Sequence, residues 1–220
     1  MVILIVNGYL KEGGTVKKLE IVLASGSPRR QEMLTQLGVP FRVQVSQVDE
    51  NVEEELTPDL LVEQLANRKA VAVANQCENA LVIGADTIVV LDGKVLGKPK
   101  DEQEAMDMLQ QLQGKKHQVF TGISVIHINE GFMQNQQVAH RMTEVTMRPL
   151  SQDKIRRYVE TGDPLDKAGA YGIQGKGAVL IEKISGCYFN VVGMSLSLLD
   201  EMLEQIGFSI TGESARSSGV

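Results

Sequence analysis

Along the chain, hydrophobic residues switch repeatedly between continuous apolar runs and helical spacing. Apolar, β-prone runs predict strands at residues 19–24, 80–91, 118–128, 137–147, 178–184 and 188–192. Apolar positions three and four residues apart predict helices at residues 28–37, 57–75, 101–113, 151–160 and 195–206. This alternation predicts an α/β fold with a mixed sheet.

Local start and stop signals support these boundaries. Ser27-Pro28 and Thr57-Pro58 each place proline at a first helical position after an N-cap residue, and Gly38 follows the first of these helices. Asp92-Gly93 predicts a hairpin turn. We expect residues 84–87 to interrupt the strand that precedes this turn.

The same pattern suggests how the chain is organised. Residues 17–208 are predicted to form a single domain, which suits their number. Residues 1–16 end in a polar break and are expected to be an extension outside the fold. Residues 209–220 are rich in serine and glycine and are expected to be a disordered tail.

The composition is that of an acidic globular protein. Hydrophobic residues make up 43% of the 220, and the formal net charge is −6. This charge disfavours nonspecific binding to nucleic acid or to an anionic membrane. No apolar run approaches the roughly 18 residues of a membrane span. Cys77 and Cys187 lack CxxC spacing, so we expect a reducing, cytoplasmic location.

The segment from Ser25 to Arg30 is the first candidate site. It joins a predicted strand to a helix N-terminus, where free N–H groups and the helix dipole favour anions. Ser25 and Ser27 add hydroxyl donors, while Arg29 and Arg30 add guanidinium groups suited to phosphate. Two arginines oppose the dipole of the helix, which points to an anionic ligand. An ordinary Ser-Pro cap with solvated arginines is the alternative interpretation.

A carboxylate and two lysines add to this candidate. Asp86 lies within an apolar stretch, where it must be paired, bind a metal or change its pKa. It could act as a general base or as a Mg²⁺ ligand, the alternative being a β-bulge aspartate bonded to nearby backbone. Lys69 falls on the apolar stripe of its helix, which suggests a buried anionic partner such as phosphate or Asp86, although snorkelling to the rim is common. Lys98 is a further cation, for which a plain loop position is the alternative.

The segment 166–175 is rich in glycine, which permits close approach of its backbone to a ligand. Its Gln174 carries an amide that could read the edge of a nucleobase, while a flexible surface loop is the alternative. Glu50 could be a second carboxylate beside a metal. Together these residues suit Mg²⁺-dependent chemistry on a polyphosphate, in which the metal bridges phosphate oxygens and activates water.

These motifs resemble, in order, those of the Maf family of nucleoside triphosphate pyrophosphatases. They are the segments 24–30, 67–70, 84–87, 97–99 and 166–175. The resemblance covers roughly residues 18–208. It implies a mixed twisted sheet with flanking helices, forming two lobes around a nucleotide-binding cleft, and a homodimer. The form of residues 166–175 resembles the branch that acts on dTTP and UTP.

The resemblance also implies roles for single residues. Asp86 matches the proton acceptor and, with Glu50, would hold Mg²⁺ or Mn²⁺. The remaining matches are phosphate-site positions at Ser25, Arg30, Lys69 and Lys98 and substrate-choice positions at Arg29, Thr87 and Gln174. After Gly193 the chain reads Met194-Ser195, where relatives often have a hydrophobic residue and proline, so we expect Ser195 to cap the last helix.

Two alternative functions come from other classes. The chain could be a nucleotide-binding regulator of cell division that does not turn its nucleotide over. Asp86 argues against this, because a carboxylate beside phosphates weakens simple binding unless a metal intervenes. Direct binding to nucleic acid is disfavoured by the net charge. Release of pyrophosphate would separate the first interpretation from both.

Overall fold

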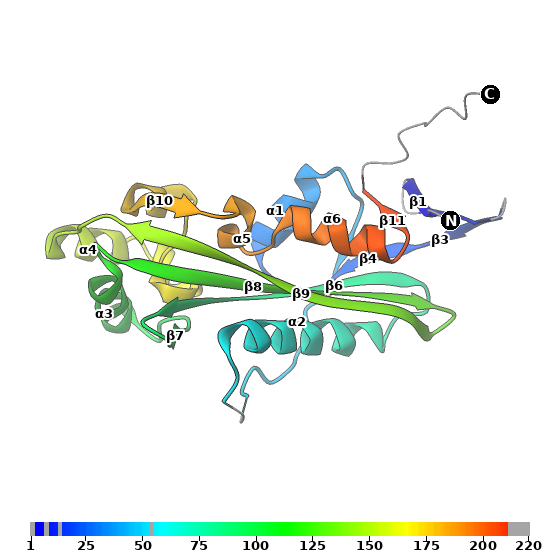
Figure 1. Ribbon diagram of the computed structural model, residues 1–220, viewed down its shortest axis with the longest axis horizontal. Coiled ribbons are helices and arrows are strands. Elements are labelled where there is room, and N and C mark those ends of the chain that lie inside the picture. The colour runs from blue at the N-terminus through cyan, green and yellow to red at the C-terminus, as the bar shows by residue number, and fades with distance from the viewer. Residues whose placement is uncertain (1–2, 7–8, 13–14, 53–54, 211–220) are drawn as a thin grey trace.

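The computed structural model describes residues 3–6, 9–12, 15–52 and 55–210, with side chains from Leu19 onward. A seven-stranded sheet dominates it, and its long central strands run the length of the molecule (Figure 1). In spatial order the strands are β10 (Ile181–Ser185), β9 (Phe132–Met147), β8 (Lys116–Asn129), β6 (Ala80–Leu91), β4 (Glu20–Leu23) and β5 (Arg42–Val43), with β7 (Lys94–Leu96) paired to β6. β4 pairs in parallel with β5 and β6, whereas the other pairs are antiparallel, so the predicted mixed sheet is confirmed.

A small second sheet lies at one end of the molecule. It contains β1 (Ile3–Val6), β2 (Tyr9–Glu12), β3 (Thr15–Lys18) and β11 (Phe208–Ser209). β1 pairs in parallel with β11, so residues near both ends of the chain lie side by side. The boundaries proposed for residues 1–16, 17–208 and 209–220 stay predictions, and residues 211–220 lie outside the described part of the chain.

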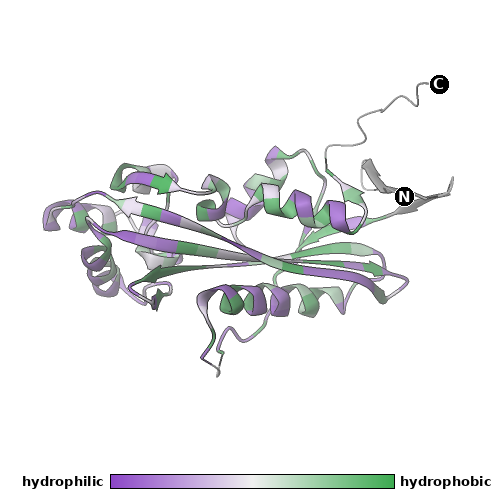
Figure 2. Cartoon of the chain, viewed as in Figure 1, coloured by the Kyte–Doolittle hydropathy of each residue, from purple (hydrophilic) through white to green (hydrophobic). Residues whose placement is uncertain are grey.

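Helices cover both faces of the large sheet (Figure 1). They are α1 (Pro28–Gln36), α2 (Pro58–Ala74), α3 (Glu102–Leu112), α4 (Gln152–Val159), α5 (Tyr188–Val192) and α6 (Leu196–Gln205). α2 lies on one face, whereas α1, α5 and α6 lie on the other. α2 and α6 each carry hydrophobic and hydrophilic residues, as amphipathic helices do (Figure 2). Among the described residues, no helix has the length and apolar character needed to cross a membrane.

The helix starts follow the local signals in the sequence, with one informative difference. Ser195 caps α6 as expected, because its Oγ accepts a hydrogen bond from the N–H of Leu198. Ser27 and Thr57 occupy N-cap positions, but neither side chain caps its helix. The hydroxyl of Ser27 is therefore not committed to the helix that it precedes.

Three local predictions are wrong. Residues 188–192 form the helix α5 and not a strand, because buried hydrogen bonds of Asn190 override the β-propensity of this aromatic and β-branched segment. The strand expected at 178–184 begins only at Ile181, after the 3₁₀ helix η3 (Gly175–Leu180). Residues 84–87 do not interrupt β6, because each of them pairs with a residue of β8.

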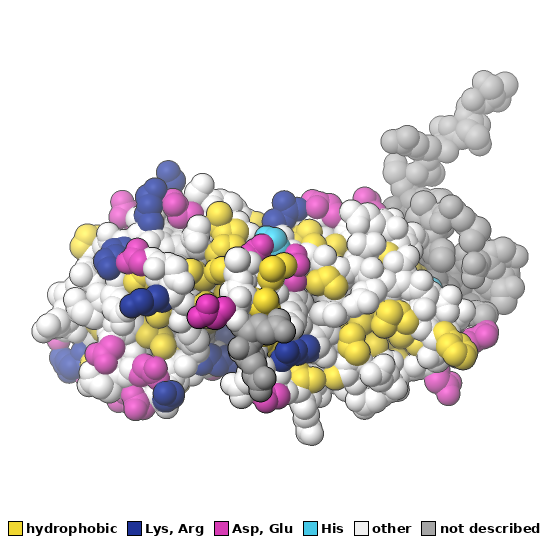
Figure 3. All heavy atoms as spheres, turned by 60° about the horizontal axis from the view of Figure 1, so that its bottom comes forward, with side chains coloured by type: hydrophobic (Ala, Val, Ile, Leu, Met, Phe, Trp, Pro, Cys, Tyr) yellow, Lys and Arg dark blue, Asp and Glu magenta, His cyan; other side chains and the backbone are white. Residues whose placement is uncertain are grey.

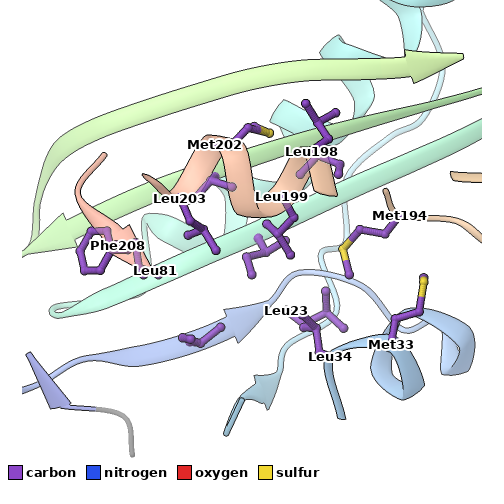
Figure 4. Packing of buried hydrophobic residues seen from close by; sticks show 14 of the residues in the cluster. Leu23, Met33, Leu34, Leu81, Met194, Leu198, Leu199, Met202, Leu203 and Phe208 are labelled. Carbon is purple, nitrogen blue, oxygen red and sulfur yellow. The ribbon is translucent and has the colours of Figure 1, made fainter. Parts of the chain in front are cut away.

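Two hydrophobic clusters divide the sheet into two lobes. The first packs α1 and α6 around β4 and β6; Leu23, Leu34, Leu81 and Leu199 lie in it (Figure 4). The second gathers α3, α4 and the far ends of β6 and β8. Because β6 and β8 contribute to both clusters, one continuous sheet holds the lobes together.

Glycines bring α2 unusually close to the other face of the sheet. A Cβ atom at Gly84 of β6 would meet the carbonyl of Ala66 and lie 2.8 Å from the nitrogen of Ala70. A Cβ atom at Gly122 of β8 would likewise meet the carbonyl of Val62. These contacts leave no room for larger residues, so the two glycines fix the height of α2 above the sheet.

Candidate active site

A cleft of about 800 Å³ lies between the two lobes. It is bordered by the turn after β4, the middle of β6, the helix α2 and the loop after β7. The structure brings nine residues singled out from the sequence to this cleft: Ser25, Ser27, Arg29, Arg30, Glu50, Lys69, Asp86, Thr87 and Lys98. Residues up to 73 positions apart thus share one site.

The turn between β4 and α1 supplies hydroxyl groups and cations. The buried Ser25 Oγ accepts hydrogen bonds from the N–H of Ser27, at 3.3 Å, and from Arg30 Nη1, at 3.0 Å. The first turn of α1 carries no acidic residue. Ser27, Pro28 and Arg29 line the cleft, so the positive end of α1 borders it and anions are favoured there.

Arg30 is buried and is held by three neutral acceptors. Its Nε donates to the carbonyl of Gly193 at 2.8 Å, Nη1 to Ser25 Oγ and Nη2 to Thr87 Oγ1 at 3.1 Å. Burial lowers the pKa of Arg30, and the nearby charge of Asp86 partly opposes this. A guanidinium stays protonated in proteins, so Arg30 is a fixed positive charge at the base of the cleft.

Lys69 joins the two candidate metal-binding carboxylates. Its Nζ lies 2.6 Å from Asp86 Oδ1 and 2.7 Å from Glu50 Oε1. The Lys69 and Asp86 side chains are each 11% exposed, whereas that of Glu50 is 58% exposed. The hydrogen bond from Lys69 lowers the pKa of Glu50, although partial burial opposes it. The lysine on the apolar stripe of α2 is therefore aimed at a buried anion, as its position in the sequence suggests.

The carboxylates fit a divalent metal that a substrate helps to hold. Lys69 Nζ occupies the point at which Asp86 Oδ1 and Glu50 Oε1 converge, so the lysine holds the two carboxylates close together, and each carboxylate has a second oxygen besides the one in this contact. Within the described part of the chain, no three His, Cys, Asp or Glu side chains are placed to hold a metal. Mg²⁺ usually takes one or two carboxylates and completes its shell with phosphate oxygens and water. Two oxygen donors therefore suit a shared metal better than a site made by protein alone.

The segment 166–175, which lies between α4 and β10, borders the cleft from the opposite lobe. Arg29 Nη1 lies 3.1 Å from Asp166 Oδ2, and both residues line the cleft. The N–H of Gly169 donates to the carbonyl of Gly97, beside the exposed Lys98. The segment 166–175 is thus tied both to α1 and to the loop that carries Lys98.

Known proteins resemble this chain over most of its length. A family described as "Maf-like protein" matches residues 20–206. The chain belongs to the Maf family. This Maf protein is 54% identical over 190 residues to the dTTP/UTP pyrophosphatase of Desulforamulus reducens, covering 86% of this chain and 98% of that relative. It is 52% identical over 191 residues to the protein of the same name from Pelotomaculum thermopropionicum, covering 87% and 98%.

Solved structures offer more distant likenesses. The Staphylococcus aureus Ham1 protein shares 21% identity at a TM-score of 0.47, over 85% of this Maf chain and 99% of that chain. A HAM1 protein from Coxiella burnetii shares 18% identity at a TM-score of 0.41, over 74% and 80%. Likeness at this level bears on neither the substrate nor the site.

Gln174 is the predicted site residue that does not line the Maf cleft. It is half-buried at the start of η3, three residues beyond Tyr171, which does line the cleft. Tyr171 is buried, with its Oη 2.6 Å from His117 Nε2. The aromatic ring of this segment thus lies closer to the site than the amide does.

Three residues in or directly behind the Maf cleft were not predicted from the sequence. Asp166 opens the glycine-rich segment, but only the fold places it against Arg29. Gly193 contributes a backbone carbonyl, which side-chain motifs do not reveal. Thr121, fully buried opposite Thr87, had one usable signal, because it is a hydroxyl residue within an otherwise apolar strand.

Proposed function

We propose that this chain hydrolyses dTTP and UTP to the nucleoside monophosphate and pyrophosphate. The observation that carries the proposal is the meeting of buried Asp86 with Arg29, Arg30, Lys69 and Lys98 in one cleft. Cations of this kind suit a triphosphate, and an embedded carboxylate suits activation of water. The names of the relatives at 54% and 52% identity supply the substrate class.

In the proposed reaction, a water oxygen attacks the α-phosphorus of the nucleotide. The bond from this phosphorus to the α–β bridging oxygen breaks, and pyrophosphate leaves with the electron pair. Asp86 accepts a proton from the attacking water at Oδ2, while Lys69 holds Oδ1. The products are the monophosphate and pyrophosphate, and one water is consumed.

The cations stabilise the departing group. Arg30 sits at the base of the cleft with its orientation set by three hydrogen bonds, so it needs no rearrangement as charge develops. Arg29 and the exposed Lys98 meet the phosphates nearer the rim. Ser25 and Ser27 complete this phosphate site with hydroxyl groups and the N-terminus of α1.

Asp86 and Glu50 would hold the divalent metal, Mg²⁺ or Mn²⁺. When bound, the metal supplies Lewis-acid polarisation of the phosphate oxygens. Lys69 holds the two carboxylates close to each other. The protein would thus supply part of the metal's ligands, and phosphate oxygens of the substrate would supply others.

Choice of the base is assigned to Arg29, Thr87 and Gln174. The amide of Gln174 can both donate and accept, which suits the edge of a pyrimidine. Replacing Gln174 with alanine should change the ratio of rates on dTTP, UTP and other triphosphates more than it changes phosphate binding. An equal loss on every nucleotide would contradict this role.

The decisive experiment measures pyrophosphate, as distinct from orthophosphate, from a panel of triphosphates with Mg²⁺ or Mn²⁺. Wild-type protein should release pyrophosphate from dTTP and UTP, and Asp86→Asn should reduce turnover about 10²–10⁴-fold. Asp92→Asn is the matched control, because it makes the same change at the exposed turn that follows the same strand. Circular dichroism should be unchanged in both variants.

Two outcomes would overturn the proposal. Near-wild-type turnover in Asp86→Asn would remove Asp86 as proton acceptor. Tight nucleotide binding without turnover of any triphosphate would instead favour a nucleotide-binding regulator of cell division.

We propose a homodimer in the cytoplasm that binds neither nucleic acid nor membrane. Acidic and basic side chains are interspersed on the face that carries α2, an arrangement that does not suit a polyanion (Figure 3). Sedimentation at several concentrations would test the dimer.

A further inference from the structure

Thr121 is a fully buried hydroxyl residue directly behind the cleft. It lies on β8, in register with Thr87 of β6, and its own side chain does not line the cleft. Its Oγ1 is 2.9 Å from Thr87 Oγ1 and 2.9 Å from the backbone carbonyl of Asn190. Through Thr121, strand β8 and helix α5 are therefore linked to Thr87, which lines the cleft.

Counting protons fixes the direction of these hydrogen bonds. A hydroxyl has one proton, and the carbonyl of Asn190 can only accept, so Thr121 donates to it. Thr87 must then donate its own proton to Thr121. This leaves the lone pairs of Thr87 Oγ1 for Arg30 Nη2, at 3.1 Å. The carbonyl of Gly193 competes poorly for the Thr87 proton, because it is 3.4 Å away and already accepts from Arg30 Nε.

The end of this chain of hydrogen bonds is itself anchored. The side-chain amide of Asn190 donates to the carbonyl of Val119 at 3.0 Å and to Thr143 Oγ1 at 3.1 Å. Asn190 is fully buried, and Gly193, three residues later, accepts from Arg30. The same segment therefore holds Arg30 directly through Gly193 and indirectly through Thr121.

We propose that Thr121 is a positioning residue that orients the guanidinium of Arg30 through Thr87. The inference rests on the proposed function, in which Arg30 stabilises the leaving pyrophosphate. By accepting the proton of Thr87, Thr121 fixes the orientation of the Thr87 hydroxyl, so that its lone pairs face Arg30. Thr87 then has no proton to donate to a substrate, so its influence on substrate choice acts through Arg30 or through its methyl group.

Replacing Thr121 with valine tests this directly, because valine keeps the shape and removes the hydroxyl. Loss of a hydrogen bond that orients a charged group should reduce kcat for dTTP about tenfold. KM should change by less than about threefold, because the loss falls on the transition state. Thr121→Ser should keep kcat within about threefold of wild type, since serine keeps the hydroxyl that links Thr87 to the Asn190 carbonyl.

A matched control separates positioning from mere stability. Ser124 is another fully buried hydroxyl on β8, but it bonds to Asn67 and lies outside the cleft lining. Ser124→Ala should lose comparable thermal stability and keep its kcat. Equal kcat in Thr121→Val and Ser124→Ala would overturn the inference. So would a full effect of Thr121→Val in an Arg30→Lys background, where a residue acting through Arg30 should matter less.

A readout independent of turnover keeps this inference separate from the proposed function. The Nη2–H resonance of Arg30, which reports the hydrogen bond to Thr87, should exchange slowly with solvent in wild type and in Thr121→Ser, and faster in Thr121→Val. Unchanged exchange in Thr121→Val would refute the positioning role, even in a protein that releases no pyrophosphate. Absence of pyrophosphate with the expected exchange pattern would refute the proposed function alone.

Discussion

The ammonium group of Lys69 lies 2.6 Å from Asp86 Oδ1, which joins helix α2 to strand β6 at the floor of the cleft. Seventeen positions separate the two residues in the chain. The contact is possible because Gly84, two residues before Asp86, lets the backbone of α2 come close to the strand. The glycine beneath α2 thus sets both the distance of this helix from the sheet and the contact between Lys69 and Asp86.

Replacing Lys69 with glutamine should impair both activity and stability. The change leaves Asp86 and Glu50 facing each other without the cation that each contacts at hydrogen-bond distance. We expect turnover to fall about a hundredfold and the free energy of unfolding to fall by about 1–3 kcal/mol. Pyrophosphate release and urea unfolding measure the two effects. Arg68→Gln is the control, because Arg68, the residue before Lys69 on α2, is half-buried and its described hydrogen bond goes to the carbonyl of Asn51.

Replacing Gly84 with alanine should destabilise the fold. The added methyl group would meet the carbonyl of Ala66 and lie 2.8 Å from the nitrogen of Ala70, and backbone cannot turn aside as a side chain can. Overpacking of this kind costs about 1–3 kcal/mol, measurable by urea unfolding. Gly97→Ala is the control, because nothing lies within 4 Å of its Cβ position. Equal stability of the two variants would show that α2 is free to move outward.

The stability of the protein should fall as the pH drops from about 6.5 to about 4. Burial lowers the pKa of His117 from 6.5 to about 4, so the unfolded chain takes up a proton that the folded chain refuses. The contribution is fully present above pH 6.5 and is lost toward pH 4, amounting to at most about 3 kcal/mol. Urea unfolding at a series of pH values should show a shallower decline in His117→Gln than in His140→Gln. Identical slopes in the two variants would exclude His117 as a source.

Replacing Asp166 with asparagine should strengthen nucleotide binding. Asp166 contacts Arg29 at 3.1 Å within the cleft, so its carboxylate competes with phosphate for the same guanidinium. Because the Asp166 side chain is 60% exposed, the effect should be modest, a fall in KM for dTTP of about twofold to fivefold at low salt. Asp153→Asn removes the same charge from the surface of α4 and should leave KM unchanged. A rise in KM would mean that Asp166 serves to orient Arg29.

Local features of this protein could be predicted from its sequence, whereas their meeting in space depends on long-range packing. Caps such as Ser195, the proline starts of α1 and α2 and the pairing of cations with hydroxyls after β4 are visible in the chain because they involve neighbouring residues. The helix at 188–192 could not be predicted in this way, since long-range hydrogen bonds of Asn190 outweigh local propensity there.

In the site, too, residue types could be predicted from the sequence but their contacts could not. Residue types, spacing and the family resemblance together singled out nine residues that line the cleft. They did not show that Lys69 joins Glu50 to Asp86, that Gln174 lies outside the cleft lining, or that Thr121 stands behind Thr87. Those relationships depend on strand register and on the height of α2 above the sheet, which close packing sets across tens of residues.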